Sequence, residues 1–311
     1  MKRKLLCVFI LAACFFGLVI PANAGPASDS ANDTATPPRL LTMGMVLYTD
    51  ASSQQATIEP LAEYLGKSLG MDIQIRLFHD YYDILNDIDH ESLELALLSP
   101  TIYSLILDDP ALTFVAVPLE RDQEFYHSVI LTNKDSSISG ISDLTGRKLG
   151  FVNTYSASGY LVPAEFLTTE GLSASGSSRY DPVFLGSHGK AVRALLEKKV
   201  DAVCTYDTFF DFTNHQLGEY KNLTLDSFKL LKQLPEKIPA DALVCRTALG
   251  KDIIARLQQA LRDYRKEREA PGSPLQKVIY TGFQTQPCEG YQSLRKRLDS
   301  LMGNSPVKER K

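Results

Sequence analysis

The amino-acid sequence predicts an α/β protein of two domains, each built from an open sheet covered by helices. From Leu40 onward, apolar runs of strand length alternate with longer runs whose apolar residues recur at helical spacing. The alternation fills two successive blocks of about 100 residues that repeat the same strand–helix order. One apolar strand leaves the first block and another returns to it, so we expect a hinge of two crossings and a ligand cleft between the domains.

The first block is expected to contain four strands and three helices. Residues 55–69 are typical of an amphipathic helix, because Ile58, Leu61, Leu65 and Leu69 recur on one face. The strand at residues 126–132 then leaves the block. The expected strands are residues 42–47, 72–78, 93–98 and 112–117, and the expected helices are residues 55–69, 81–88 and 101–107.

The second block follows the same order. Its expected strands are residues 148–152, 182–185 and 202–205, and its helices are residues 159–169, 190–198 and a third after Asp207. The strand at residues 242–246 returns to the first block, and a long helix at residues 249–267 follows it. We expect mostly parallel sheets, with domain 1 at residues 39–127 and 243–300, domain 2 at residues 128–242, and a disordered tail at residues 301–311.

The N-terminal segment has the composition of an export signal. Basic residues at positions 2–4 precede an apolar run at positions 5–20, and an A-x-A cleavage site ends at Ala24. We therefore expect a signal peptide at residues 1–24, a flexible leader at residues 25–38 and a periplasmic protein. The competing interpretation is the Leu-Ala-Ala-Cys pattern ending at Cys14, which would give a lipoprotein anchored at the membrane surface.

The charge balance argues against nucleic acid as a partner. The chain has 33 basic and 37 acidic residues, a net charge of −4. Removal of residues 1–24 takes away three basic residues and no acidic ones, which brings the net charge to about −7. An acidic exported protein lacks the basic surface that binds a phosphate backbone.

The sequence lacks the common motifs of enzymes and metal proteins. It contains no GxxxxGK[ST], GxGxxG, HExxH or GxSxG pattern, so we do not expect an enzyme. Cys204, Cys245 and Cys288 have neither CxxC spacing nor a nearby histidine cluster, so no metal or cofactor is expected. Whether Cys204 and Cys245 form a disulfide is left open at this point.

The most informative segment runs from Asp143 to Pro163. It predicts a short turn, an apolar strand, a hydroxyl-rich loop and a helix whose start contains Ser156, Ala157 and Ser158. A helix start carries unpaired N–H groups and a partial positive charge, so it can hold an anion. Gly159 is expected to let a ligand approach the backbone closely. The alternative is that Ser158 merely caps the helix.

Further polar side chains fall where open α/β sheets bind ligands, at the carboxyl ends of predicted strands and at the crossings. Each also has an ordinary explanation as a cap, a turn residue or a packed aromatic side chain. Together their hydroxyl, phenol and imidazole donors suit a protonated tetrahedral oxyanion, because carboxylates can accept from a P–OH group or from a ligand ammonium. The residues concerned are Tyr48, Tyr81, Ser99, Tyr126, His188, Asp207 and Asp241.

The chain resembles the periplasmic solute-binding proteins of phosphonate, phosphite and phosphate ABC importers, a family with the type II binding-protein fold. Residues 143–146 (DLTG) and 156–163 (SASGYLVP) are similar to the family motifs DLxGK and STSGYLxP. The resemblance extends from Leu41 to Tyr280. Supporting segments follow the family order at residues 61–70, 99–103, 126–128, 186–188 and 238–241.

The resemblance implies a set of ligand-binding residues. The helix start would hold the phosphonate oxygens, and two tyrosines, a histidine and two carboxylates would surround it. Two departures bear on the ligand: Ala157 stands where the family has Thr, and Gly189 stands where an acidic residue is common. The expected ligand-binding residues are Tyr48, Tyr81, Ser99, Thr101, Tyr126, Ser156, Ala157, Ser158, His188, Asp207 and Asp241.

The resemblance also implies a partner, the permease of an ABC importer, to which a small oxyanion would be delivered. Contact with the membrane would come only through the permease or through a lipid on Cys14. A receptor module that feeds a sensor kinase is the alternative, and an enzyme built on the same fold is the third.

Overall fold

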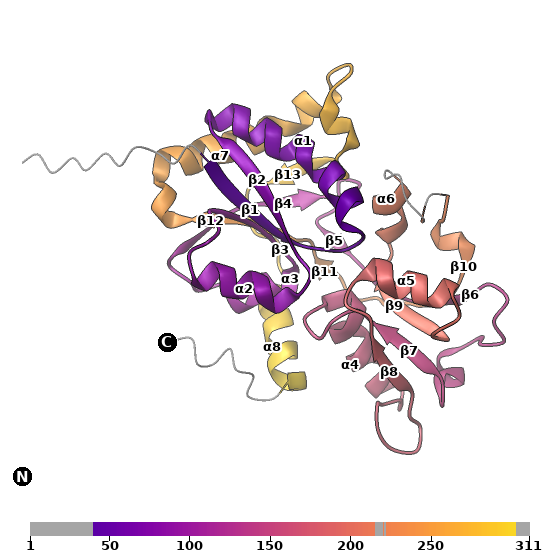
Figure 1. The fold of residues 1–311 in the computed structure, drawn as a ribbon. Coiled ribbons are helices and arrows are strands. Elements are labelled where there is room, and N and C mark those ends of the chain that lie inside the picture. The colour runs from indigo at the N-terminus through magenta and orange to yellow at the C-terminus, as the bar shows by residue number, and fades with distance from the viewer. Residues whose placement is uncertain (1–39, 215–219, 221, 303–311) are drawn as a thin grey trace, which may run out of the picture. The chain divides into compact units, whose positions relative to one another are not determined.

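The computed structural model describes residues 40–214, 220 and 222–302 (Figure 1). The expected signal peptide, the leader and Cys14 lie outside the described residues. The helix α8 (Tyr291–Met302) extends into the segment that was expected to be a disordered tail, and residues 303–311 of that segment are outside the described residues. The mixed α/β class predicted from the alternating pattern is confirmed.

We call lobe 1 the six-stranded sheet and the helices that pack on it. The strands lie in the order β13-β4-β12-β3-β1-β2, so β12 returns from the distant part of the chain into the middle of the sheet. The strands are β1 (Leu40–Val46), β2 (Asp72–Phe78), β3 (Leu95–Leu98), β4 (Leu112–Leu119), β12 (Ala242–Arg246) and β13 (Gly282–Gln284), and the helices are α1 (Ala51–Leu69), α2 (Tyr81–Asp89), α3 (Pro100–Leu105), α7 (Lys251–Glu269) and α8.

We call lobe 2 the five-stranded sheet in the order β10-β6-β9-β7-β8 with its helices. Figure 1 shows α4 and α5 beside this sheet. The strands are β6 (Ser128–Asn133), β7 (Lys148–Phe151), β8 (Asp181–Phe184), β9 (Ala202–Tyr206) and β10 (Phe228–Gln233), and the helices are α4 (Val162–Thr169), α5 (His188–Leu196) and α6 (Phe209–Asn214).

The central strands β3 and β12 of lobe 1, and β6 and β9 of lobe 2, are buried on both faces, which explains their continuous apolar runs. In β3, Leu95 and Leu97 pack with α1 and α7, while Ala96 and Leu98 pack on the opposite side with α2 and α3. The alternation follows from the two-residue period of a strand. The core cluster on the α2 side continues into lobe 2, where it includes Val203.

The chain passes between the lobes through a two-stranded antiparallel ribbon of β5 (Phe125–Tyr126) and β11 (Ile238–Pro239). One continuous strand had been expected at residues 126–132. The structure instead breaks it at His127, because β5 pairs with β11 while β6 pairs with β9 and β10 in lobe 2.

The expectation of mostly parallel sheets is wrong. Parallel pairing joins β1 to β2 and β3, and β7 to β8 and β9. Antiparallel pairing joins β12 to β3 and β4, β13 to β4, and β6 to β9 and β10. The physical reason lies in the crossings: β6 and β12 start at the side of the sheet where the parallel strands end, so they must run in the opposite direction.

The described cysteines are free. Cys204 is buried in β9 of lobe 2 and Cys245 is buried in β12 of lobe 1, so the disulfide that the sequence left open is not formed. Burial raises the pKa of both thiols, that of Cys245 to about 12. Both behave as small apolar core residues.

Candidate functional site

A cavity of about 370 Å³ lies between the two lobes and is lined by side chains from both of them and from the crossing ribbon. Two residues expected to bind the ligand, Thr101 and Ser158, are not part of its lining. The other expected residues all line it: Tyr48, Tyr81, Ser99, Tyr126, Ser156, Ala157, His188, Asp207 and Asp241.

The helix start after β7 contributes a capped turn to this cavity. Residues Ala157–Leu161 form a π-helical turn that leads into α4. The Ser156 hydroxyl accepts a hydrogen bond from the N–H of Gly159 at 3.0 Å, so the cap is Ser156 and not Ser158. The N–H groups that open a helix have no partner within it, and together with the Ser156 hydroxyl they form a donor set for an anion.

Three positions that were expected to contribute to the site lie outside the cavity lining. A Cβ atom at Gly159 would lie 2.4 Å from Cγ2 of Val152, so glycine is required there for contact with the end of β7 and not for approach of a ligand. Ser158 is buried, and its hydroxyl is hydrogen-bonded to the Tyr126 phenol. Thr101 is fully buried within α3, so it does not reach the cavity surface.

His188 lies in the first turn of α5, where Ser187 is the cap. Its Nδ1 is 2.9 Å from the Thr205 hydroxyl and its Nε2 is 3.4 Å from the Ser156 hydroxyl. Burial lowers the pKa of His188 to about 3, so the ring is neutral at physiological pH. A neutral imidazole contributes hydrogen bonding to the cavity without adding charge.

Asp241 and Tyr48 form a polar pair in the cavity wall. The Tyr48 phenol donates to Oδ2 of Asp241 at 2.8 Å. Burial raises the pKa of Asp241 to about 7; the Tyr48 hydrogen bond opposes the rise, and the nearby Glu120 carboxylate adds to it. Asp241 can therefore accept from a ligand when ionised or donate to it when protonated.

Glu120 is a cavity residue that the sequence analysis missed. It follows β4, and its Oε2 accepts from the Thr208 hydroxyl of lobe 2 at 2.7 Å. Burial raises the pKa of Glu120 to about 7; the Thr208 hydrogen bond opposes the rise, and the carboxylates of Asp211 and Asp207 add to it. No local pattern marks Glu120, because its environment is made by residues that are distant in sequence.

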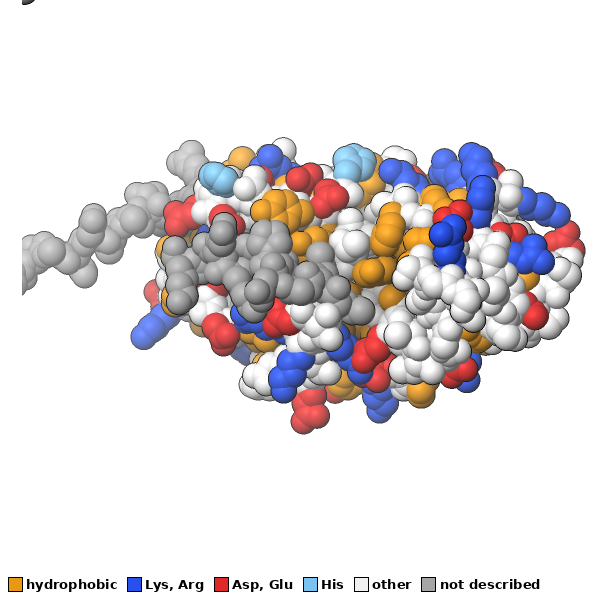
Figure 2. All heavy atoms as spheres, turned by 90° about the horizontal axis from the view of Figure 1, so that it is seen from below, with side chains coloured by type: hydrophobic (Ala, Val, Ile, Leu, Met, Phe, Trp, Pro, Cys, Tyr) orange, Lys and Arg blue, Asp and Glu red, His pale blue; other side chains and the backbone are white. Residues whose placement is uncertain are grey.

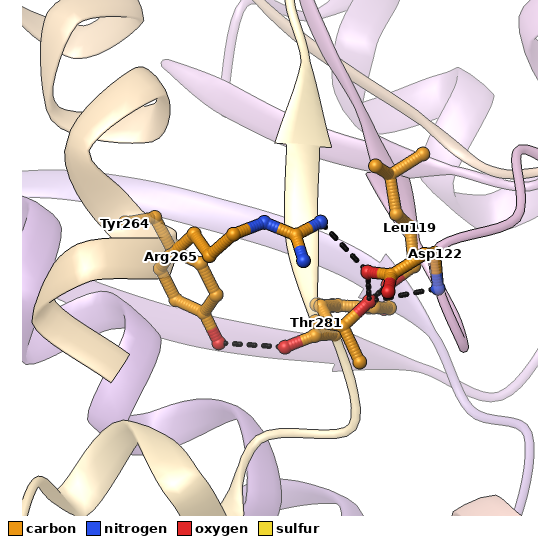
Figure 3. A network of polar contacts seen from close by, with 6 residues as sticks. Leu119, Asp122, Tyr264, Arg265 and Thr281 are labelled. Atoms are coloured by element: carbon orange, nitrogen blue, oxygen red, sulfur yellow. Dashed lines mark hydrogen bonds and ion pairs between the residues drawn. The ribbon is translucent and has the colours of Figure 1, made fainter. Parts of the chain in front are cut away.

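Figure 3 shows the network that anchors the loop carrying Glu120. The Oδ1 atom of Asp122 accepts from Arg265 at 2.7 Å and from the Thr281 hydroxyl at 2.8 Å. The Thr281 N–H donates to the Leu119 carbonyl at 2.8 Å. These contacts fix the end of β4 against the segment before β13, so Glu120 is held in place from outside the cavity.

Five phenols face the cavity, and two of them were missed. Tyr206 ends β9 directly before Asp207, so the strand-end rule could have identified it. The backbone of Tyr280 is held by a hydrogen bond, because the Tyr264 phenol donates to its carbonyl at 3.0 Å. Burial raises the pKa of all five phenols, so they remain protonated donors. They are Tyr48, Tyr81, Tyr126, Tyr206 and Tyr280.

The Asp207 side chain, at the edge of the cavity, connects lobe 2 to His127 at the end of the crossing ribbon. Its carboxylate accepts from the backbone N–H of His127 at 3.0 Å and from the Gln233 amide at 3.2 Å, and it lies 3.3 Å from Nδ1 of His127. The side chain therefore has a structural task as well as a place on the cavity lining.

Figure 2 shows acidic and basic side chains interspersed over the face turned toward the viewer, which agrees with the small net charge. Among residues 40–214, 220 and 222–302, no three His, Cys, Asp or Glu side chains are grouped as a metal site would require. In the same part of the chain, none of the helices combines the length and the apolar character needed to cross a membrane.

Comparison with known proteins identifies the family. Residues 43–287 match the family model described as the periplasmic substrate-binding protein of a phosphonate ABC transporter. The chain belongs to this family. The resemblance found in the sequence is thereby confirmed, and the substrate-binding character of the family agrees with a site built from donors and acceptors.

Relatives with sequence or structural similarity are consistent with this assignment. The phosphate-import protein PhnD of Mycolicibacterium smegmatis is 26% identical over 258 residues, covering 79% of this chain and 78% of PhnD. PhnD1 from Prochlorococcus marinus, solved with methylphosphonate, superposes with a TM-score of 0.72 at 18% identity, covering 85% of this chain and 99% of that one.

A binding-protein component of a phosphonate ABC transporter from Pseudomonas aeruginosa gives a TM-score of 0.70 at 19% identity, covering 85% of this chain and 86% of that one. The fold is thus that of type II periplasmic binding proteins, as the sequence predicted.

Proposed function

We propose that this protein is an exported solute-binding protein that captures a phosphonate-, phosphite- or phosphate-like oxyanion in the cavity and delivers it to the permease of an ABC importer. The observation that carries the proposal is the cavity chemistry: a capped helix start and neutral phenol and imidazole donors surround the Asp241 carboxyl. Membership of the family and the ligands named for its relatives support the same class.

Neutral donors suit a small oxyanion that carries one negative charge. Phenol, hydroxyl and backbone N–H groups stabilise an anion through hydrogen bonds without the desolvation of a buried cation. The Ser99 hydroxyl adds to this set, since it is buried and has no hydrogen-bond partner within the described ranges. A ligand oxygen that reaches Ser99 would satisfy that hydroxyl.

The Asp241 carboxylate gives a basis for selecting protonated ligands. A phosphorus oxyanion that keeps a P–OH group can donate to it, whereas sulfate has no proton to donate at neutral pH. Glu120 raises the negative potential on the same cavity, which further disfavours a dianion. We therefore expect hydrogen phosphonates and the monoanion of phosphate to bind in preference to sulfate.

The binding cycle proposed here requires two bodies that close on the ligand. These are domain 1 (residues 39–127 and 243–300) and domain 2 (residues 128–242), joined near His127 and Ala240. A periplasmic protein that starts at Gly25 is the processed form expected to carry out this task. Intact mass of the exported protein tests this point, because an acylated Cys14 at the N-terminus would place it on the membrane surface instead.

Calorimetry at pH 7 with phosphate, phosphite, methylphosphonate and sulfate tests the ligand class. We expect saturable binding of at least one phosphorus oxyanion, and a ligand at 100 times its dissociation constant should add about 2.7 kcal/mol of stability. Equal or tighter binding of sulfate, or no binding of any phosphorus compound, would contradict the proposal. Uptake of the bound compound in cells with and without the permease separates import from sensing.

A further inference from the structure

The two lobes meet at a backbone contact beside the cavity. The N–H of Gly189, in the first turn of α5, donates to the carbonyl of Tyr48 at 3.0 Å. Tyr48 follows β1 in lobe 1, so this bond joins one lobe to the other. Donors in the first turn of a helix have no partner within the helix, so this N–H is available for a contact between lobes.

The backbone contact involves Tyr48 itself and the residue that follows His188, so it is next to two cavity side chains. The rings of Tyr48 and His188 both line the cavity, and their centroids are 6.2 Å apart in an edge-to-face arrangement. The backbone bond at Gly189 therefore fixes how closely Tyr48 of lobe 1 approaches His188 of lobe 2. A change in this spacing would change the positions of both groups relative to a ligand held between them.

The approach of the lobes at this point is tighter than the space that a Cβ atom normally has. A Cβ atom at Gly189 would lie 3.2 Å from Cα of Thr49 and 3.1 Å from the phenol oxygen of Tyr220. Carbon atoms in favourable contact are about 3.5–4.0 Å apart, so the neighbours would have to withdraw. Thr49 presents backbone, which cannot turn aside as a side chain can, so the backbone of lobe 1 at this point must shift to make room.

Other hydrogen bonds between the lobes are made by side chains. Thr208 donates to Glu120 at 2.7 Å, and the Asn153 amide lies 3.5 Å from the Asp80 carboxylate. Side chains can follow a small separation of the lobes by changing rotamer, whereas the backbone bond at Gly189 cannot. The closest approach of the lobes is thus set by the backbone contact.

We propose that Gly189 is a positioning residue that permits the fully closed arrangement of the lobes, and that any larger residue there weakens ligand binding without touching the ligand. The inference rests on the proposed function of the cavity as a binding site that closes. When only a fraction of the protein can adopt the binding-competent state, the apparent dissociation constant rises in inverse proportion to that fraction.

The Gly189→Ala variant makes a distinctive prediction. Alanine has a higher helix propensity than glycine, so the ligand-free protein should melt at the same temperature as the wild type or higher. Separation of the lobes removes the contact with Thr49, whereas the contact with Tyr220 lies within lobe 2 and remains, so the added Cβ atom should shift the lobes toward separation. Gly140→Ala is the matched control, because a Cβ atom at Gly140 meets nothing within 4 Å and its backbone is extended at φ −150°.

The test compares wild type, Gly189→Ala and Gly140→Ala by calorimetry with phosphate and methylphosphonate, by thermal melting without ligand, and by small-angle scattering. We expect Gly189→Ala to bind at least fivefold more weakly, to dissociate faster and to melt no lower, while Gly140→Ala matches the wild type. Wild-type affinity in Gly189→Ala would overturn the proposal. A loss of affinity accompanied by a lower ligand-free melting temperature would also overturn it, since it would show a packing role within lobe 2.

Failure of the proposed function can be recognised separately. If the wild type binds neither phosphate nor methylphosphonate, the ligand assignment is wrong. Small-angle scattering of the ligand-free proteins then decides whether Gly189 permits closure of the lobes. A more extended Gly189→Ala protein supports the role of Gly189 in closure, and identical scattering curves for the two proteins reject it.

Discussion

Replacement of Asp241 by asparagine should make the ligand-free protein more stable at alkaline pH. Burial raises the pKa of the Asp241 carboxyl from 3.8 to about 7. The folded protein therefore binds this proton more tightly than the unfolded chain does. The stability that Asp241 contributes is fully present below pH 4 and is lost as the pH rises through 7. Asparagine has the same shape and no such loss.

The size of the effect follows from the shift. One pKa unit corresponds to 1.36 kcal/mol, so a rise from 3.8 to about 7 sets an upper limit of about 4 kcal/mol. The side chain is only partly buried and faces the cavity, so water there screens the charge. Asparagine can still accept from the Tyr48 phenol, so the 2.8 Å bond is not lost. We expect a gain of about 1–3 kcal/mol at pH 8.

Chemical denaturation of both proteins between pH 4 and pH 8 measures this difference. The gain should be greatest at pH 8 and small near pH 4, where the wild-type carboxyl is protonated in the folded protein and partly protonated in the unfolded chain. Asp207→Asn is the matched control, because Asp207 accepts from the His127 N–H and the Gln233 amide and its variant should be less stable. A variant Asp241→Asn that is less stable at pH 8, or a difference independent of pH, would refute the reasoning.

Three further predictions concern the helix starts. His188→Gln should lose less stability than the wild type between pH 6.5 and pH 4, by up to about 3 kcal/mol in denaturation curves, because burial lowers the pKa of His188 to about 3; parallel curves would contradict this. Gly159→Ala should cost about 1–3 kcal/mol in thermal melts through its clash with Val152; an unchanged melting temperature would show that the helix start can shift. Ser156→Ala should weaken oxyanion binding in calorimetry more than Ser158→Ala, since Ser156 lines the cavity and Ser158 does not; the reverse order would reject the assignment.

The parts of the fold that the sequence predicts are those defined by local patterns. The strands at residues 72–78 and 242–246 have the predicted bounds, because uninterrupted apolar or alternating runs end there at turns. The start of α1 was placed four residues too late. Residues 51–54 are mostly polar, yet the helix begins there, since Asp50 caps it by accepting from the Ser53 N–H.

The candidate site is predictable as far as it follows strand ends and helix starts. Tyr48 and Ser156 occupy such positions and line the cavity as expected. Glu120 and Tyr280 were missed because their roles depend on partners far away in sequence, Thr208 for the former and Tyr264 for the latter. The antiparallel direction of β12 was also missed, because it depends on where the chain re-enters lobe 1 and not on a local sequence pattern.

The cavity places two titratable groups with opposite pH responses close together. His188 resists protonation, so stability associated with it falls as the pH drops from 6.5 toward 3. Asp241 resists ionisation, so stability associated with it falls as the pH rises from 4 toward 7. The two slopes oppose each other over the shared range of pH 4 to 6.5.

Burial also raises the pKa of Glu120 to about 7, so Glu120 adds a slope of the same sign as that of Asp241, and wild-type stability should fall as the pH rises through this range. His188→Gln leaves the Asp241 slope unopposed, so its stability should fall as the pH rises from 4 to 6.5. Asp241→Asn leaves the Glu120 slope to oppose that of His188, so its stability should stay nearly level over the same interval. His188 and Asp241 are both uncharged near pH 5, so neither adds a charge beside a ligand anion held in the cavity at that pH. Denaturation series on the wild type and the two variants decide the point: a variant whose slope equals that of the wild type would show that the group it lacks does not titrate as its burial requires.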